Sequence, residues 1–216
     1  MTDQKSKVQT LFVLVKPDGY PHKNFIKSLM IDEMDGMRTC NLQDDVYMTP
    51  EDVLKHYPKN DEWLAKYGEK ICAARLKVKI EDVTSWDALL YGDTIMPALS
   101  SYMTSGIMSA MIFTYLSNKD CFALARNLLG DVDPSKASVG SIRRLFSGDS
   151  FEKAWTGDSG PRAIENVCHI SDSQEEAYSE ACLFLGQEKA YPFFSHLFPA
   201  CEQASREAVR LVSSGR

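Results

Sequence analysis

The chain has 216 residues, of which 25% are charged and 44% hydrophobic, and its formal net charge is −6. These values are typical of one globular domain, or of two small ones, and they exclude wholesale disorder. The acidic balance argues against a broad basic surface for nucleic acid, although a few well-placed cations can still hold a small phosphate ligand.

The predicted elements begin with a strand over residues 10–15, a continuous run of β-forming apolar residues typical of a strand covered on both faces. The Lys-Pro-Asp-Gly turn at 16–19 ends it. A helix is predicted over 24–35, and a loose alternation over 37–48 predicts a second strand. The residues expected on the apolar face of that helix are Phe25, Leu29, Met30 and Met34.

The middle of the chain is predicted to be helical. Thr49 is a cap followed by Pro50 in the first turn, and Pro58 ends this short helix. Two longer helices are expected, over about 61–77 and 84–102.

The second half of the chain is expected to return to the sheet. Residues 107–115 predict a buried strand, and residues 118–129 predict an amphipathic helix that stops at Gly130. Residues 147–161 read as a long exposed loop, because they carry Ser, Gly, Asp and Pro. The remaining predictions are a strand over 163–170, a helix over 173–185 and a helical tail over 194–212.

No repeat, linker or low-complexity segment divides the chain, so this order of elements predicts an α+β or α/β sandwich in one domain. The six cysteines are irregularly spaced and form no CxxC pair, which disfavours a zinc ribbon or a thioredoxin-like site. With no signal-peptide pattern and no stretch apolar enough for a bilayer, we expect a cytoplasmic protein with reduced thiols and no membrane contact.

Phosphate-binding loops of the GxxxxGK[ST] and GxGxxG types are absent from the sequence, so any phosphate must be held by side chains. Lys16 stands at the end of a rigid strand, which suits the positioning of a charged ligand. Arg143 can bind phosphate bidentately through its planar guanidinium. Taken alone, each of these residues, like Arg126, is an ordinary solvated cation.

His169 lies at a predicted strand-to-helix junction, where an unprotonated ring nitrogen can attack an electrophile at neutral pH. A structural histidine is the common alternative. Glu180 is two turns along the following helix, on the face of Ser173, and either orients an imidazole or is surface charge. Cys168 points to the opposite face of the strand from His169, so we expect a packing residue rather than a nucleophile.

Six segments, in order along the chain, resemble the nucleoside diphosphate kinase family, in a longer branch with insertions. The resemblance implies a ferredoxin-like βαββαβ fold with a four-stranded antiparallel sheet in a single domain over 1–216. It further implies insertions at about 68–99 and 146–162 and a C-terminal extension at about 187–216. The segments are Thr10–Gly19, His56-Tyr57, Tyr102–Met111, Arg126–Arg143, Asn166–Ser173 and, at the matching distance, Glu180.

The activity implied by this resemblance is a ping-pong transfer of the γ-phosphate of a nucleoside triphosphate to a nucleoside diphosphate, through phosphohistidine at His169. Lys16 is then catalytic, and Glu180 with Ser171 orients the imidazole. Mg²⁺ bridges the phosphates without direct protein ligands, and a homo-oligomer is expected. The implied nucleotide-binding residues are Lys16, Tyr57, Trp63, Arg126, Val132, Arg143 and Asn166.

Three positions depart from the family pattern. Val132 stands where a threonine usually touches phosphate, Ile170 replaces a small residue after the active histidine, and Val139 replaces a proline. These departures leave open an alternative, a catalytically weak or inactive homologue that binds nucleotides or acts as a scaffold. A nucleic-acid partner is not expected, given the acidic total.

Overall fold

Four strands form one antiparallel sheet in the order β2-β3-β1-β4. The computed structural model describes residues 7–34, 42–57, 60–158 and 160–198. This architecture, with helices packed on the sheet, confirms the expected ferredoxin-like α+β fold. The strands are β1 (Lys7–Val15), β2 (Leu42–Val46), β3 (Met108–Ser117) and β4 (Cys168–Ile170).

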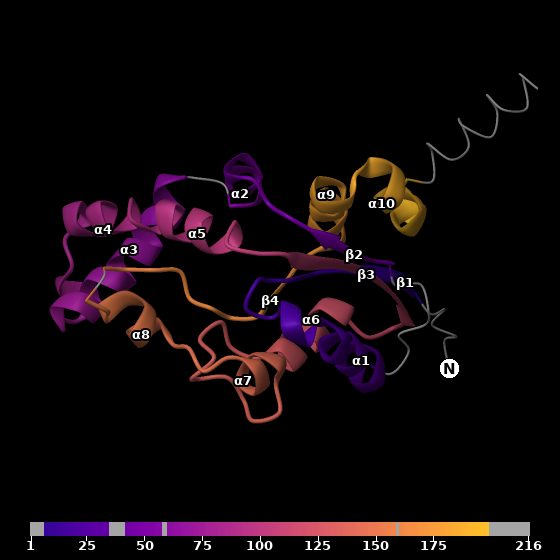
Figure 1. Ribbon diagram of the computed structural model, residues 1–216, viewed down its shortest axis with the longest axis horizontal. Coiled ribbons are helices and arrows are strands. Elements are labelled where there is room, and N and C mark those ends of the chain that lie inside the picture. Colours follow the sequence, from indigo (N-terminus) through magenta and orange to yellow (C-terminus); the bar gives the residue numbers. More distant parts are fainter. Residues whose placement is uncertain (1–6, 35–41, 58–59, 159, 199–216) are drawn as a thin grey trace, which may run out of the picture.

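Helices cover both faces of the sheet, which explains why the apolar run in β1 is fully buried from Leu11 to Val15 (Figure 1). α1 and α6 lie on one face, and α9 and α10 lie on the other (Figure 1). Their bounds are α1 (Lys23–Glu33), α6 (Cys121–Leu129), α9 (Gln174–Leu185) and α10 (Gln187–Phe194).

The predicted helix starts are confirmed by their caps. Thr49 caps α2 (Pro50–His56) with a capping box. Its hydroxyl accepts from the amide of Asp52 at 3.2 Å, and the Asp52 carboxylate accepts from the amide of Thr49 at 2.9 Å. Ser173 caps α9 with its hydroxyl, which accepts from the amide of Glu176 at 3.1 Å. α3 (Asp61–Leu76) begins and ends within one residue of its prediction.

The single helix expected over 84–102 is wrong, because the chain forms two helices, α4 (Ser85–Gly92) and α5 (Ile95–Met103). α4 packs very closely on α3. A Cβ at Gly68 would lie 1.7 Å from the carbonyl oxygen of Ala88, and one at Gly92 would lie 2.6 Å from that of Leu64. α4 therefore follows α3 only as far as this glycine contact, after which the chain turns into α5.

The exposed loop expected over 147–161 is also wrong in part, because it contains α8 (Phe151–Thr156). Ala154 and Trp155 are buried, and Phe151 stacks on Trp155 with ring centroids 4.2 Å apart. Apolar residues at positions i, i+3 and i+4 bury one helical face. With residues of α3 and α5, this face forms a small second core beside the main one.

Other boundaries shift for local reasons. The apolar face of α1 is rotated from its prediction, so that Phe25 is 58% exposed while Ile26 is buried. The strand expected over 163–170 shortens to β4, since only three residues pair with β1. The predicted second strand and C-terminal helix fall partly outside the described residues, at 37–41 and 199–212.

The structure describes four of the six cysteines, and all four are free thiols. None of the described helices is long and apolar enough to cross a membrane. The remaining short helices are α7 (Ile142–Phe146) and the 3₁₀ turns η1 (Tyr20–His22), η2 (Ile80–Asp82) and η3 (Ser195–Leu197).

Candidate functional site

A cavity of about 580 Å³ lies beside the ends of β1 and β4 and is walled by α3, α5, α6 and α8. Its two ends differ in chemistry. Every nucleotide-binding residue named from the sequence lines it, together with His169. The polar end carries Lys16, Arg126, Arg143, Asn166 and His169, and the apolar end carries Trp63, Tyr67, Ile71, Leu99 and Trp155.

His169 is held through one of its two ring nitrogens. Nε2 lies 2.7 Å from Oε1 of Glu180, whose Oε2 accepts a hydrogen bond from the Ser171 hydroxyl. Burial alone would raise the pKa of the Glu180 carboxyl, but the hydrogen bond from His169 and the neighbouring His56 ring lower it to about 2. Because Glu180 is therefore an anion that accepts, Nε2 carries the hydrogen, and Nδ1 of the neutral ring carries the free lone pair.

Lys16 is buried at the end of β1. Its Nζ donates to Oδ1 of Asn166 at 2.7 Å, and Nδ2 of Asn166 donates to the carbonyl of Val132 at 3.2 Å. Burial, together with the nearby charge of Arg143, lowers the pKa of Lys16 to about 8. The ammonium is thus poised to recover its full charge when an anion enters the cleft.

Arg143 is only 9% exposed, and its hydrogen bonds connect three segments of the chain. Its guanidinium donates to the carbonyls of Gly130 at 2.9 Å, Cys168 at 3.0 Å and Asn166 at 3.3 Å. Arg126 differs, since its side chain is half exposed and pairs with Asp172 at 2.8 Å. One arginine is therefore fixed by the fold, and the other is free to turn toward a ligand.

Three aromatic side chains lie in a row along one wall of the cavity. Tyr57 lies 6.5 Å from Trp63, which lies 4.7 Å from Tyr67, measured between ring centroids. Burial raises the pKa of the Tyr57 hydroxyl well above its usual range, so this hydroxyl remains a hydrogen-bond donor. Tyr57 and Trp63, both named from the sequence, therefore lie side by side in the cavity lining.

The three departures from the family pattern have different settings. Val132 lines the polar end of the cavity, and its side chain offers no hydroxyl. Ile170 packs into the main core opposite Val13 in the sheet and also lines the cavity beside His169, where it adds bulk but no polar group. Val139 is almost fully exposed, at 94%. Only Val132 therefore changes the polar groups that a phosphate would meet.

Cys168 is fully buried, and burial raises the pKa of its thiol to about 12. It stays protonated at neutral pH and packs in the main core. The structure therefore agrees with the expectation that it is not a nucleophile paired with His169.

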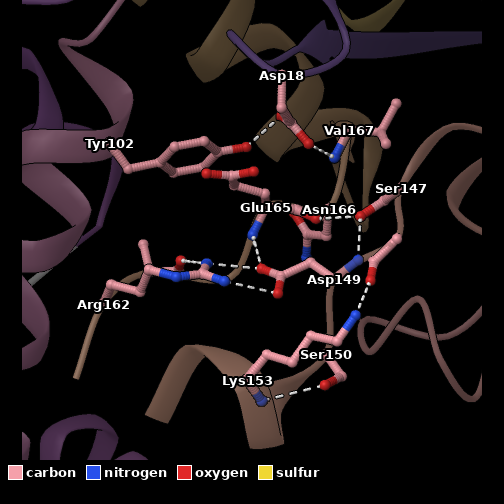
Figure 2. Close-up of polar contacts among 12 residues, drawn as sticks. Asp18, Tyr102, Ser147, Asp149, Ser150, Lys153, Arg162, Glu165, Asn166 and Val167 are labelled. Atoms are coloured by element: carbon pink, nitrogen blue, oxygen red, sulfur yellow. Dashed lines mark hydrogen bonds and ion pairs between the residues drawn. The ribbon is translucent and has the colours of Figure 1, made fainter. Parts of the chain in front are cut away.

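A strained turn positions the segment that carries Asn166 and His169. Val167 has a φ of 70°, which is unusual for a β-branched residue, and the amide of Cys168 donates to the carbonyl of Asn166 across it at 2.7 Å. Figure 2 shows Asp18 between two donors, the Val167 amide at 2.9 Å and the Tyr102 hydroxyl. These contacts hold the turn and so fix the direction of β4.

A second polar cluster holds the chain just before this turn (Figure 2). The Asp149 carboxylate is 7% exposed and accepts two hydrogen bonds from the guanidinium of Arg162, both at 2.7 Å. It also accepts from the amide of Glu165 at 2.9 Å. Sequence reasoning missed this pair, because Asp149 lies within the predicted exposed loop, 147–161, and Arg162 directly follows it.

His56 is a further residue that sequence reasoning did not place in the site. Its ring meets His169 edge-on with centroids 4.8 Å apart, and its Nδ1 lies 3.2 Å from Oε1 of Glu180. The His-Tyr pair is evident in the sequence, but the contact with Glu180 depends on how α2 packs against α9.

Comparison with known proteins identifies relatives along most of the chain. A sequence model described as nucleoside diphosphate kinase matches residues 61–190. The nucleoside diphosphate kinase of Pyrobaculum aerophilum is 29% identical over 185 residues, which cover 84% of this chain and 97% of that protein. The nucleoside diphosphate kinase of Sulfurisphaera tokodaii is 26% identical to this chain, over 84% of this chain and 92% of that protein.

Solved structures give the same result. The crystal structure of the Pyrobaculum aerophilum NDP kinase superposes with a TM-score of 0.67 at 27% identity, over 85% of this chain and 99% of that one. The Borrelia burgdorferi enzyme, solved with vanadate and ADP, has a TM-score of 0.57 at 18% identity over 82% and 86% of the two chains, and so supports the fold alone. Because the family model covers more than half of its length, this chain belongs to the nucleoside diphosphate kinase family, a family of phosphotransferases.

Proposed function

We propose that this protein transfers the γ-phosphoryl group of a nucleoside triphosphate to a nucleoside diphosphate, with His169 as the covalent carrier. The observation that carries the proposal is the hydrogen bond from Nε2 of His169 to Glu180, at 2.7 Å. It leaves Nδ1 as the basic nitrogen of a ring that lines the same cavity as the buried cations Lys16 and Arg143.

In the first half-reaction, the Nδ1 lone pair forms a bond to the γ-phosphorus while the bond from that phosphorus to the β–γ bridging oxygen breaks. The nucleoside diphosphate leaves with those bonding electrons. The ring then carries the positive charge that Glu180 stabilises through Nε2, and no proton has to be removed. A second nucleoside diphosphate reverses these steps and takes the phosphoryl group.

Most of the catalytic effect in phosphoryl transfer comes from alignment and from the neutralisation of spread negative charge. Lys16 and Arg143 supply fixed cations, and Asn166 holds the Lys16 ammonium in place. Arg126 is exposed enough to exchange Asp172 for a phosphate oxygen. Tyr57 contributes a protonated hydroxyl in the same cleft.

Mg²⁺ fits this cleft as an ion held chiefly by the nucleotide's own phosphates. The carboxylates of Asp131 and Asp172 line the cavity and are oxygen donors of the kind that Mg²⁺ prefers. When bound, the ion would neutralise charge on the phosphate oxygens. The protein's own cations would still have to orient the γ-phosphoryl group toward Nδ1.

Val132 favours a second candidate, a homologue that binds nucleotides but transfers phosphate slowly. Its side chain removes one hydroxyl contact from the polar end. We favour activity because the nucleophile, its orienting carboxylate and the two buried cations are together in one cavity. One lost hydroxyl contact would lower the rate without removing the chemistry.

We extend the proposal to a single domain over 1–216 that assembles as a homo-oligomer in the cytoplasm. Sedimentation velocity of the purified chain tests the assembly, with a particle larger than one chain as the expected result. A monomer at micromolar concentration would contradict it.

The experiment for the activity is labelling with γ-labelled ATP in the presence of Mg²⁺. We expect an acid-labile phosphoenzyme that loses its label when ADP is added, and no label in His169→Ala. His22→Ala is the matched control, since His22 stacks on Phe146 outside the cavity and should label normally. Nucleotide binding without label in the wild-type protein would refute the transfer and favour the slow homologue.

A further inference from the structure

His56 is buried without the hydrogen bonds that a buried imidazole normally has. Its side chain is 1% exposed, and neither ring nitrogen has a hydrogen-bond partner among the described residues, although Nδ1 is 3.2 Å from Glu180. Buried polar atoms without partners are rare, and each one calls for an explanation such as an ion.

Two other potential ligand atoms lie next to this ring. His56, His169 and Glu180 each offer one ligand atom, and these three atoms all lie within 4.8 Å of one another. Oε1 of Glu180 lies between the rings, 3.2 Å from Nδ1 of His56 and 2.7 Å from Nε2 of His169. Ligand atoms around a tetrahedral zinc ion are about 3.3 Å apart. These three atoms would therefore have to move only slightly relative to one another to bind a zinc ion.

The chemistry of the three ligands selects the kind of ion. Two imidazoles and one carboxylate, with a fourth position left for water, form a ligand set that zinc enzymes use. Mg²⁺ prefers oxygen ligands and strict octahedral geometry, so it would not compete for this set. The ion that fits is therefore a borderline-soft divalent metal, with Zn²⁺ as its natural representative.

A second cavity, separate from the nucleotide cleft, borders two of the three residues. This cavity of about 550 Å³ is lined by His56 and Glu180, together with Ser179 and Cys182. None of the nucleotide-binding residues lines this second cavity, and His169 lines only the first. His56 and Glu180 therefore border a cavity that a bound nucleotide would leave unfilled.

We propose that His56, His169 and Glu180 form a zinc site whose occupancy reversibly switches off phosphotransfer. Without metal, the single proton of the neutral His169 ring is on Nε2, and Nδ1 is the nucleophile. When Zn²⁺ takes the Nε2 lone pair, that proton moves to Nδ1 through solvent. Nδ1–H has no lone pair to offer phosphorus, so no phosphoenzyme forms. Removal of the metal restores the original tautomer.

Binding of the metal stands on the geometry alone, whereas its effect on the reaction rests on the proposed function. Co²⁺ titration into the full-length protein without nucleotide tests the binding. We expect one equivalent to give the visible absorption of a four-coordinate site and Zn²⁺ to displace it. His56→Gln should lose this signal, while His196→Gln and Cys182→Ser should keep it. A signal equal in wild type and His56→Gln would overturn the site.

A measurement on the wild-type protein makes the test independent of how the variants fold. Long-range ¹H–¹⁵N correlation of the histidine rings assigns the tautomer of His169 before and after one equivalent of Zn²⁺. We expect the proton on Nε2 without metal and on Nδ1 with it, with a shift at Nδ1 of His56. An unchanged pattern for both rings would refute the proposal.

The switch itself is tested by the rate of phosphoenzyme formation at saturating Mg²⁺–ATP, with each protein compared with its own metal-free rate. We expect Zn²⁺ to inhibit wild type, a chelator to restore it, and His56→Gln to need at least about tenfold more Zn²⁺ for the same inhibition. Metal binding without inhibition would refute the switch. A protein that is inactive without metal would instead refute the proposed function, and the cobalt spectrum would still decide the site.

Discussion

The two ends of the nucleotide cleft are built on different principles. At the polar end, buried side chains are fixed by hydrogen bonds. Arg143 donates to three backbone carbonyls, and Lys16 donates to the side chain of Asn166. At the apolar end, aromatic and aliphatic side chains of α3, α5 and α8 line the wall, partly from segments that the sequence marks as insertions. Under the proposed function, the polar end would carry out the phosphoryl transfer, while the apolar end would contact the nucleoside part of the substrate.

Removing the cation at the centre of the polar end should have the largest effect. Arg143→Met should lower kcat/KM by at least about 100-fold, because it deletes a fixed cation and leaves three buried carbonyls without their donor. Steady-state kinetics with ATP and a nucleoside diphosphate measure this. Arg144→Met is the control, since Arg144 makes a single exposed contact with Ser135, and it should stay within about twofold of wild type. Equal losses in both variants would contradict a special role for the buried Arg143 at the polar end.

Truncating the aromatic wall should affect binding more than chemistry. Trp63→Ala should raise KM about tenfold with a smaller change in kcat, since stacking of a base on an aromatic side chain is worth about 1–3 kcal/mol. Trp86→Ala is the matched control, because Trp86 is 75% exposed and does not line the cavity. A loss that falls on kcat rather than KM would mean that Trp63 belongs functionally to the polar end.

The lowered pKa of Lys16 predicts that kcat/KM falls on the alkaline side of its pH profile. Burial lowers this pKa to about 8, so the ammonium is charged below that pH and neutral above it. kcat/KM should therefore fall as pH rises through 8, approaching tenfold per pH unit, because a neutral amine attracts phosphate weakly. kcat should fall at a higher pH, since bound phosphate raises the pKa of Lys16. A flat profile of kcat/KM to pH 9.5 would contradict this role.

The smallest effect is expected at the cluster that ties α8 to the active-site turn. Asp149→Asn should weaken the bidentate pair with Arg162, and because Arg162 is half exposed the cost should be only about 1–2 kcal/mol. The melting temperature should fall by about 4 °C, with a few-fold loss of activity. Glu152→Gln, on the exposed side of α8, should melt like wild type. No difference between the two would show that the cluster does not hold the turn.

The predictable parts of the fold are those with local causes. The buried run of β1, the caps at Thr49 and Ser173, and the position of His169 in the short strand before α9 all follow from neighbouring residues. The same holds for Glu180, whose spacing along one helix face places it near the imidazole. Neighbouring residues in the sequence are therefore enough to predict these features.

The features that escaped prediction depend on contacts between distant segments. The break between α4 and α5 follows from the close approach of Gly68 and Gly92 to the opposite helices. His56 reaches Glu180 only because α2 packs against α9. The pair of Asp149 and Arg162 closes a segment whose composition is that of a loop. Sequence patterns do not encode these distances.

The most direct test of the account is the position of the phosphoryl group on the trapped phosphoenzyme. The protein is phosphorylated with ATP and Mg²⁺, freed of nucleotide at alkaline pH, and examined by ³¹P and long-range ¹H–¹⁵N NMR. We predict one phosphoryl group, bonded to Nδ1 of His169, with Nε2 still protonated and donating to Glu180. A phosphoryl group on Nε2, or on any other residue, would contradict it.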